Sequence, residues 1–389
     1  MFLTREEESI LEGELGSGRQ KAMEILVALG KVFDAEELIP IVSAHLSGVS
    51  YKTIGEGGLS FLLEMKEEAR VRVKTTLNPA GMDLERWREM GVSEGFARKQ
   101  IEIIDCYRSM GVQTCCTCTP YLSYNIPSLG DHVSWAESNA LSYVNSVIGA
   151  MTNREGGPGA LSAAILGKTP KYGLHLEENR RPMMVVEAEI DKDALSHSLL
   201  GQVVGSRLCN AIPFFRGISP DTDRLKTMAA AMAASGAIAM FHVEGITPFS
   251  GSQDLRGLER IQVDRSDIED AKDHLTTGSE PDLIALGCPH LTEAEVREIA
   301  ALLRGRERRG DAEVWFCTNR GVIESCPEEI EVLEEFGRVL CDTCMVVAPI
   351  ESGHSCTGTN SAKACNYLPG LCSQKVVCES TLRLMEMIS

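Results

Sequence analysis

The chain has 389 residues, with 38 Lys and Arg against 56 Asp and Glu, so its formal net charge at pH 7 is −18. A surface this acidic repels phosphate backbones, which argues against nucleic-acid binding. Hydrophobic residues make up 43% and charged residues 24%, a balance typical of ordinary globular proteins that excludes a largely disordered chain. The length predicts two or three domains.

The N-terminal region predicts two amphipathic helices and no targeting segment. Thr4 can cap a first helix that has Glu at positions 6, 7 and 8, and apolar residues recur at helical spacing over 18–33. Charged residues begin at position 5, and no apolar run has the length of a signal peptide or a membrane span. We therefore expect a cytoplasmic protein with no membrane association. Its 14 cysteines are then metal ligands, nucleophiles or core residues rather than disulfides.

From about residue 40 the chain alternates between short apolar runs and helical patterns. We expect strands over 39–45, 71–79, 112–120, 183–190, 238–243, 282–290, 313–320 and 344–350, and helices over 93–110, 221–234, 292–304 and 327–340. This alternation predicts an open α/β fold with mostly parallel sheets. A boundary is expected near residue 200, between an N-terminal lobe (1–200) carrying Cys118 and the polar segment 130–159 and a C-terminal lobe (201–389) carrying Cys288 and Cys344.

Several cysteines fall where expected strands end or begin: Cys118, Cys288, Cys317 and Cys344. In open α/β sheets, ligands bind beyond the carboxyl ends of the strands, so three converging thiols there can hold an iron–sulfur cluster. Each thiol alone is more often a core residue. Cys341 and Cys344 also form a C-x-x-C pair, which is compatible with a redox pair or half of a zinc site.

Three polar loops can bind an anion. Residues 152–158 place Arg154 before two glycines, residues 47–55 are rich in Gly and Ser, and residues 352–363 end in Lys363. None of them matches a nucleotide-binding motif. His242 and Glu244 end another expected strand and can transfer protons, although a buried structural histidine is an equally good interpretation.

Taken together, these segments strongly resemble the aconitase X family. The resemblance runs from residue 3 to about residue 371 and is carried by the ordered motifs 47–55, 118–121 (Cys-Thr-Pro-Tyr), 131–139, 145–146, 152–158 (Thr-Asn-Arg-Glu-Gly-Gly-Pro), 172–175, 241–245, 287–290 (Gly-Cys-Pro-His) and 343–347. It implies an aconitase-like, multi-lobed, three-layer α/β/α fold. It also implies that Cys118, Cys288 and Cys344 hold an iron–sulfur cluster of the 4Fe-4S type, with one iron open to substrate.

The family has two activity types. One is a single long chain that dehydrates cis-3-hydroxy-L-proline and carries a fused swivelling domain. The other is split into two subunits and dehydrates (R)-mevalonate 5-phosphate to trans-anhydromevalonate 5-phosphate in an archaeal mevalonate route to isoprenoids. Because this chain stops at Ser389, soon after the last catalytic-domain motif, we expect the large subunit of a heterodimeric hydro-lyase of the split type.

The resemblance also suggests roles for individual residues. Glu137 and Lys363 are expected to be catalytic, while the main base, by analogy with aconitases, is a serine on the small swivelling subunit. Contacts to a small anionic substrate are expected from Gly48, Val49, Ser50, Asn78, Asn153, Arg154 and Lys363. Two alternatives stay open: a dehydratase of cis-3-hydroxy-L-proline or another small hydroxy acid, and a non-enzymatic scaffold subunit stabilised by zinc.

Overall fold

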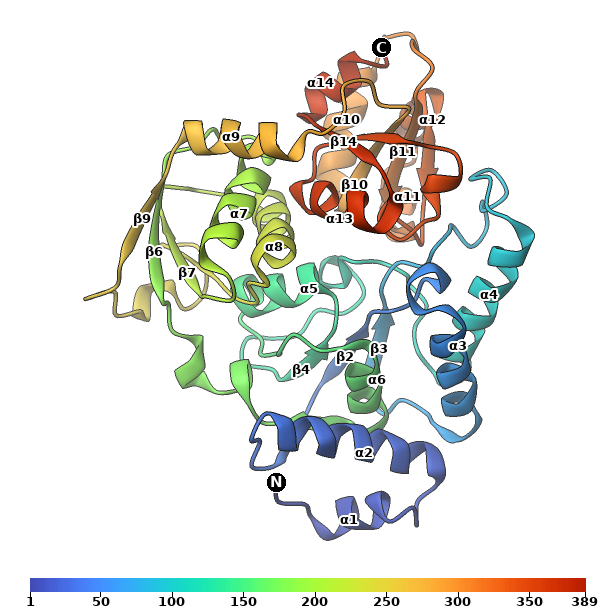
Figure 1. Ribbon diagram of the computed structural model, residues 1–389, viewed down its shortest axis with the longest axis vertical. Coiled ribbons are helices and arrows are strands. Elements are labelled where there is room, and N and C mark those ends of the chain that lie inside the picture. Colours follow the sequence, from blue (N-terminus) through green and yellow to red (C-terminus); the bar gives the residue numbers. More distant parts are fainter.

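The computed structural model describes residues 1–389 and divides into three packed units, each built around its own parallel sheet. In Figure 1 the first unit lies at the bottom, the second at the left and the third at the top. The N-terminus lies at the end of the first unit and the C-terminus at the opposite end of the molecule, on the third.

The first unit surrounds a sheet of order β3-β2-β4, made by β2 (Ser43–Leu46), β3 (Lys74–Leu77) and β4 (Val133–Trp135). All its pairings are parallel. Its helices are α1 (Arg5–Leu11), α2 (Ser17–Val32), α3 (Tyr51–Glu68), α4 (Glu94–Ser109), α5 (Ser138–Tyr143) and α6 (Gly157–Leu166). β1 (Leu38–Pro40) and β5 (Lys168–Pro170) form a separate antiparallel pair. The two expected N-terminal helices are confirmed, and Thr4 caps α1 as part of a capping box.

The second unit has a parallel sheet of order β8-β7-β6-β9, formed by β6 (Met184–Ala188), β7 (Pro213–Arg216), β8 (His242–Val243) and β9 (Arg260–Val263). Two helices, α7 (Ala194–Leu208) and α8 (Thr222–Gly236), pack between this sheet and the rest of the molecule, and α9 (Arg265–Leu275) leads to the third unit (Figure 1). The two helices touch closely at Gly205 and Gly236. A Cβ on Gly236 would lie 2.0 Å from the Gly205 carbonyl oxygen, so this approach requires glycine.

The third unit is a three-layer α/β/α sandwich. Its parallel sheet has the order β12-β11-β10-β13-β14, from β10 (Leu283–Leu291), β11 (Glu313–Thr318), β12 (Arg338–Leu340), β13 (Cys356–Thr359) and β14 (Lys375–Cys378). One face packs on α10 (Glu293–Leu303), α12 (Pro327–Phe336) and α14 (Thr381–Glu386). The other face packs on α13 (Ala362–Cys372) and, beyond it, α7 and α8. A short helix, α11 (Arg320–Ser325), follows β11.

The α/β fold with mostly parallel sheets is confirmed, but two expected strands are wrong. Residues 112–120 form an irregular connection joined to β3 by one isolated bridge, because Cys116 adopts a positive φ of 38° that ends extended pairing. Residues 344–350 form turns, in which the Val347 and Ala348 N–H groups donate to the Cys344 carbonyl. The helix expected over 327–340 ends at Phe336, and β12 follows it. The boundary near residue 200 stays a prediction; the chain there lies within α7.

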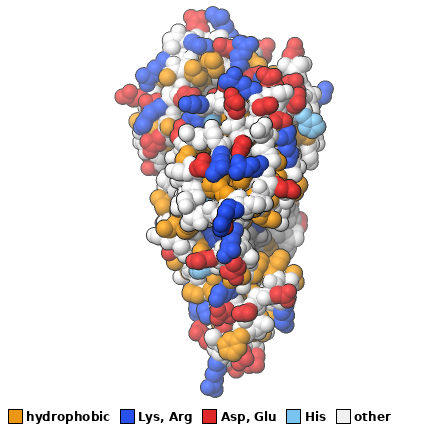
Figure 2. Space-filling model, turned by 90° about the vertical axis from the view of Figure 1, so that its left-hand side faces the viewer, with side chains coloured by type: hydrophobic (Ala, Val, Ile, Leu, Met, Phe, Trp, Pro, Cys, Tyr) orange, Lys and Arg blue, Asp and Glu red, His pale blue; other side chains and the backbone are white.

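No helix in the structure is long and apolar enough to span a membrane. Seen from the left-hand side of Figure 1, the surface carries Lys and Arg side chains interspersed with Asp and Glu (Figure 2). The net charge of −18 is therefore not gathered into one acidic region on this face.

Candidate active site

The cysteines singled out in the sequence meet in a cavity of about 230 Å³ between the first and third units. It lies where parallel strands of both sheets end: Ser47 follows β2, Asn78 follows β3, Glu137 follows β4, and Lys363 follows β13. The carboxyl ends of parallel strands are the usual location of ligand sites in α/β folds. The cavity is lined by Ser47, Asn78, Pro79, Cys118, Ala136, Glu137, Ser138, Arg154, Cys288, Cys344, Val346, Val347, Lys363, Tyr367 and Leu371.

Cys118 is held by contacts from two different units. Its sulfur accepts a hydrogen bond from the His290 backbone N–H at 3.2 Å, in the third unit. Its carbonyl accepts from Asn139 Nδ2 at 2.8 Å, and Asn139 lies in the first turn of α5 in the first unit. An N–H donor aimed at sulfur favours the thiolate, which is the form that binds metal.

Cys288 lies inside β10, directly after Gly287. Gly287 has a φ of 101°, and a Cβ there would lie 2.0 Å from the Cys317 carbonyl oxygen, so only glycine allows the backbone to turn at this point. The third thiol, Cys344, lies in the turn after β12, where Thr343 makes an isolated bridge to Ala80 of the first unit. The sequence alone left Cys317 and Cys341 as alternatives; both are buried, and neither lines the cavity.

In the chain alone, the Cys118 and Cys344 thiols are poor acids. Burial raises the pKa of Cys118 to about 12. The positive charge of Lys363 and the hydrogen bond from the His290 N–H lower this pKa, but burial has the larger effect. A hydrogen bond with Cys288, together with burial, raises the pKa of Cys344 well above its ordinary value. A bound metal deprotonates the thiols that coordinate it and removes this penalty. No three or more His, Cys, Asp or Glu side chains are grouped around one point as ligands of a single ion would be.

Glu137 and Lys363 form a buried ion pair across the cavity. The Glu137 carboxylate also accepts from Asn78 Nδ2 at 2.8 Å. Burial opposes ionisation of Glu137, but Lys363 and Asn78 outweigh it and lower the pKa of the carboxyl. For Lys363, burial disfavours the ammonium, while Glu137, Cys288 and Cys118 attract it and raise its pKa. The site therefore contains a stable ammonium beside three thiols.

Arg154 is the second cation of the cavity and is exposed. Its guanidinium makes only a long hydrogen bond, 3.4 Å, to the Ala233 carbonyl, so donors remain for a ligand. The opposite wall is apolar, formed by Val346, Val347, Tyr367 and Leu371. A small anion with an apolar part fits these surroundings.

Of the residues expected at the site, the cavity contains Cys118, Cys288, Cys344, Asn78, Glu137, Arg154 and Lys363. It does not include four others. Gly48, Val49 and Ser50 follow the lining residue Ser47, and Ser50 Oγ donates to the carbonyl of another lining residue, Val347, at 2.9 Å. Asn153 has its amide occupied by the Tyr172 carbonyl at 3.0 Å and the Leu174 N–H at 2.8 Å.

Ser47 and Ser138 also line the cavity, and neither was among the substrate contacts expected from the sequence, although Ser47 begins the polar loop 47–55. Ser47 directly follows β2, and Ser138 begins α5 two positions after Ala136, at the end of β4. The signal that was available is their place immediately after short apolar runs. For Ser138 this signal was not recognised, because β4 has only three residues and was not predicted as a strand.

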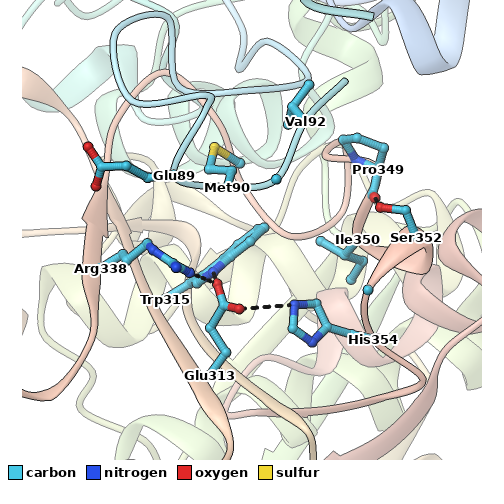
Figure 3. A pocket seen from close by; sticks show the side chains of 12 residues that line it. Glu89, Met90, Val92, Glu313, Trp315, Arg338, Pro349, Ile350, Ser352 and His354 are labelled. Atoms are coloured by element: carbon cyan, nitrogen blue, oxygen red, sulfur yellow. Dashed lines mark hydrogen bonds and ion pairs between the residues drawn. The ribbon is translucent and has the colours of Figure 1, made fainter. Parts of the chain in front are cut away.

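A larger cavity of about 410 Å³ lies between the loop 89–92 of the first unit and β11 and β12 of the third (Figure 3). Its charged groups already face one another: Glu313 contacts both Arg338 and His354. It has no thiol, and Glu89 and Glu313 would repel an anion. The smaller cavity is therefore the candidate active site.

Three family models match consecutive parts of the chain: aconitase X first domain over residues 1–178, second domain over 182–273 and third domain over 281–388. These matches follow the three units seen in the structure.

Comparison with individual proteins gives the same family as the family models. The chain is 48% identical to the phosphomevalonate dehydratase large subunit of Methanothermobacter thermautotrophicus over 99% of its own length and 98% of that protein. It is 34% identical to the cis-3-hydroxy-L-proline dehydratase of Pseudomonas aeruginosa, over 95% of this chain and 67% of that one. The crystal structure of Thermococcus kodakaraensis aconitase X in its holo form superimposes with a TM-score of 0.94 at 42% identity, covering 100% of both chains. The chain belongs to the aconitase X family.

Proposed function

We propose that this chain is the large, catalytic subunit of a hydro-lyase that dehydrates (R)-mevalonate 5-phosphate to trans-anhydromevalonate 5-phosphate, a step of an archaeal mevalonate route. The relative at 48% identity that carries this activity in its name is matched from end to end. The hydroxyproline dehydratase is more distant, and the chain spans about two thirds of it. The alternative of a non-enzymatic scaffold subunit stabilised by zinc is less well supported, because the matched relatives are named as enzymes.

The observation that carries the proposal is the meeting of three thiols and an ammonium in one cavity. Cys118, Cys288 and Cys344 come from separate segments and face Lys363. Thiolates are the usual ligands of iron–sulfur clusters, and the His290 N–H and Lys363 both favour the thiolate form of Cys118. The donor set fits a cluster held by three cysteines. When bound, such a group supplies a Lewis acid for the leaving hydroxyl.

The chain's own side chains supply charge and orientation. The dehydration removes a proton from the carbon beside a carboxylate, so negative charge grows on that carboxylate. Lys363 and Arg154 are the cations available to bind it, and cations placed in advance stabilise the charge as it develops. Glu137 keeps Lys363 charged and, with Asn78, holds its position. The apolar wall receives the hydrocarbon part of the substrate.

The proton acceptor is proposed to come from a small partner subunit. In this chain the only carboxylate lining the cavity, Glu137, is already bound to Lys363 and Asn78. A name that includes "large subunit", as that of the relative at 48% identity does, implies a smaller one. We therefore expect the heterodimer to be the active form, with a serine of the small subunit completing the site.

The test is to purify the chain anaerobically, with and without the small subunit, and to assay mevalonate 5-phosphate and cis-3-hydroxy-L-proline by mass spectrometry. The proposal expects that the heterodimer removes one water molecule from mevalonate 5-phosphate and that the isolated chain does not. If the heterodimer dehydrates cis-3-hydroxy-L-proline and not mevalonate 5-phosphate, the chain has the other activity of the family. Robust turnover by the isolated chain would refute the partner-supplied base.

A further inference from the structure

Beneath the proposed active site lies a buried histidine that the mechanism above does not use. His45 is fully buried in β2, where the parallel register places it between Thr76 of β3 and Trp135 of β4. Its Nδ1 lies 2.9 Å from Thr76 Oγ1. Its Nε2 has no hydrogen-bond partner. A buried ring nitrogen without a partner calls for an explanation.

A second buried atom without a partner lies beside it. Asn78 Oδ1 makes no hydrogen bond, although the same amide donates through Nδ2 to Glu137 at 2.8 Å. The two side chains lie on the same side of the sheet: His45 contacts Thr76, and Asn78 follows Thr76 by two positions, the repeat that returns a side chain to the same face of a strand. The Asn78 N–H donates to the Leu46 carbonyl at 2.9 Å, which keeps this segment beside β2. One atom can donate and the other can accept, so the two unpaired atoms are complementary.

The surroundings of Thr76 decide which ring nitrogen carries the proton. Asn125 Nδ2 donates to Thr76 Oγ1 at 3.2 Å, so the hydroxyl hydrogen is free to go elsewhere. The Ala44 carbonyl is 3.4 Å away and already accepts from Asn125 at 3.1 Å, whereas His45 Nδ1 is at 2.9 Å. The hydroxyl therefore donates to Nδ1. Burial keeps the ring neutral by lowering its pKa to about 4, which leaves the proton on Nε2.

We infer that His45 is a positioning residue: its Nε2–H donates to Asn78 Oδ1 and fixes the Asn78 amide so that Nδ2 faces Glu137. An amide can rotate to exchange its oxygen and nitrogen. A reversed Asn78 would turn its oxygen toward the Glu137 carboxylate and repel it, which would loosen the pairing of Glu137 with Lys363. The chain Thr76–His45–Asn78–Glu137–Lys363 thus connects a strand of the first unit to the cation of the cavity. Only the expected effect on turnover rests on the proposed function; the hydrogen bond and the tautomer of His45 do not.

Two substitutions of His45 distinguish its contact with Thr76 from its contact with Asn78. In His45→Gln, the side-chain amide can reach the position of Nε2 and donate to Asn78. In His45→Asn, the shorter amide keeps the contact with Thr76 but does not reach Asn78. We expect His45→Asn to lower kcat/KM of the holo heterodimer by about 10- to 100-fold, the usual effect of displacing a group that orients the chemistry, and His45→Gln to lower it much less. Equal losses, or a larger loss in His45→Gln, would overturn the inference.

The same pair of substitutions at His197 is the control. His197 is also buried, with Nδ1 bonded to the Asp193 carbonyl at 2.9 Å and Nε2 without a partner, but it lies on α7 and does not line the cavity. Its Gln and Asn variants are expected to change the melting temperature, but the two variants should have similar values of kcat/KM. A separation at His197 as large as that at His45 would mean that the effect is structural.

A measurement without substrate distinguishes this inference from the proposed function. The chain has 8 histidines, so nitrogen-15 spectra of the histidine-labelled chain, with His45→Gln to assign the signals, reveal the tautomer of His45 at neutral pH. The inference expects the neutral ring with its proton on Nε2. A proton on Nδ1, or a charged ring, would overturn it even if the enzyme works as proposed. Absence of mevalonate 5-phosphate turnover with the Nε2–H form present would instead reject the proposed function.

Discussion

Glu137 and Lys363 are 226 residues apart in the chain and form a buried ion pair that joins the first unit to the third. Glu137 stands at the start of α5 and Lys363 in the first turn of α13. Both side chains are about nine-tenths buried, so neither charge is well solvated. The pair is therefore a structural connection between units as well as the electrostatic centre of the cavity.

Replacing one member of this pair leaves a buried charge without a partner. Lys363→Met should lower the free energy of unfolding by about 3–5 kcal/mol and abolish dehydration. The double variant Glu137→Gln/Lys363→Met should recover most of the stability, because no charge is left unpaired, and none of the activity. Chemical denaturation and turnover, measured on the same samples, check both statements.

A matched control is the pair between Lys168 and the buried Glu7, at 2.6 Å, which lies outside the cavity. Lys168→Met should also destabilise the protein but leave turnover close to that of the wild type. Recovery of activity in the double variant at the site would contradict a role of the charges in the chemistry.

Arg154 and Asn153 are neighbours with different expected roles. Arg154 lines the cavity with free donors, so Arg154→Ala should raise KM for an anionic substrate by about 10- to 100-fold, equivalent to losing one charge-assisted contact of roughly 1.5–3 kcal/mol. Asn153 is occupied by backbone groups of residues 172 and 174, so Asn153→Ala should mainly lower the melting temperature. Steady-state kinetics with an unchanged KM for Arg154→Ala would remove this residue from the site.

Glu155 predicts a pH dependence of stability. Burial raises the pKa of its carboxyl from 4.5 to about 7, and one of its oxygens has no hydrogen-bond partner. Because the folded state holds this proton more tightly than the unfolded state, the wild type should lose stability as pH rises from 4.5 to about 7, by up to about 3 kcal/mol.

Glu155→Gln removes this titration. The variant should match the wild type in melting temperature at pH 5 and exceed it at pH 8. Equal melting temperatures at both values would show that Glu155 is not buried as a neutral acid.

The alternation of apolar and helical segments was enough to predict the α/β class, since strands such as β10, which contains Cys288, could be located from the local pattern. Two strands were misplaced where backbone geometry overrides the pattern. Residues 112–120 are apolar enough for a strand, but Cys116, which is buried in the core of the first unit, adopts a positive φ that a local apolar pattern does not indicate.

At the site, the sequence predicted the three thiols, Asn78, Glu137, Arg154 and Lys363, and all of them line one cavity. The choice of Cys288 and Cys344 over Cys317 and Cys341 needed the family resemblance, because all four stand near strand ends. The pairing of Glu137 with Lys363 was not predictable, since it joins elements of different units. Likewise, the role of His45 became visible only when parallel register placed it beside Thr76.

The most direct test of the account is the iron and acid-labile sulfide content of the anaerobically purified chain beside two variants, Cys288→Ser and Cys317→Ser. Cys288 lines the cavity, whereas Cys317 is fully buried behind it, so the second variant controls for loss of a buried thiol. The account predicts iron and sulfide in the wild type and in Cys317→Ser, and their loss in Cys288→Ser. Iron and sulfide retained in Cys288→Ser, or zinc without sulfide in the wild type, would contradict it.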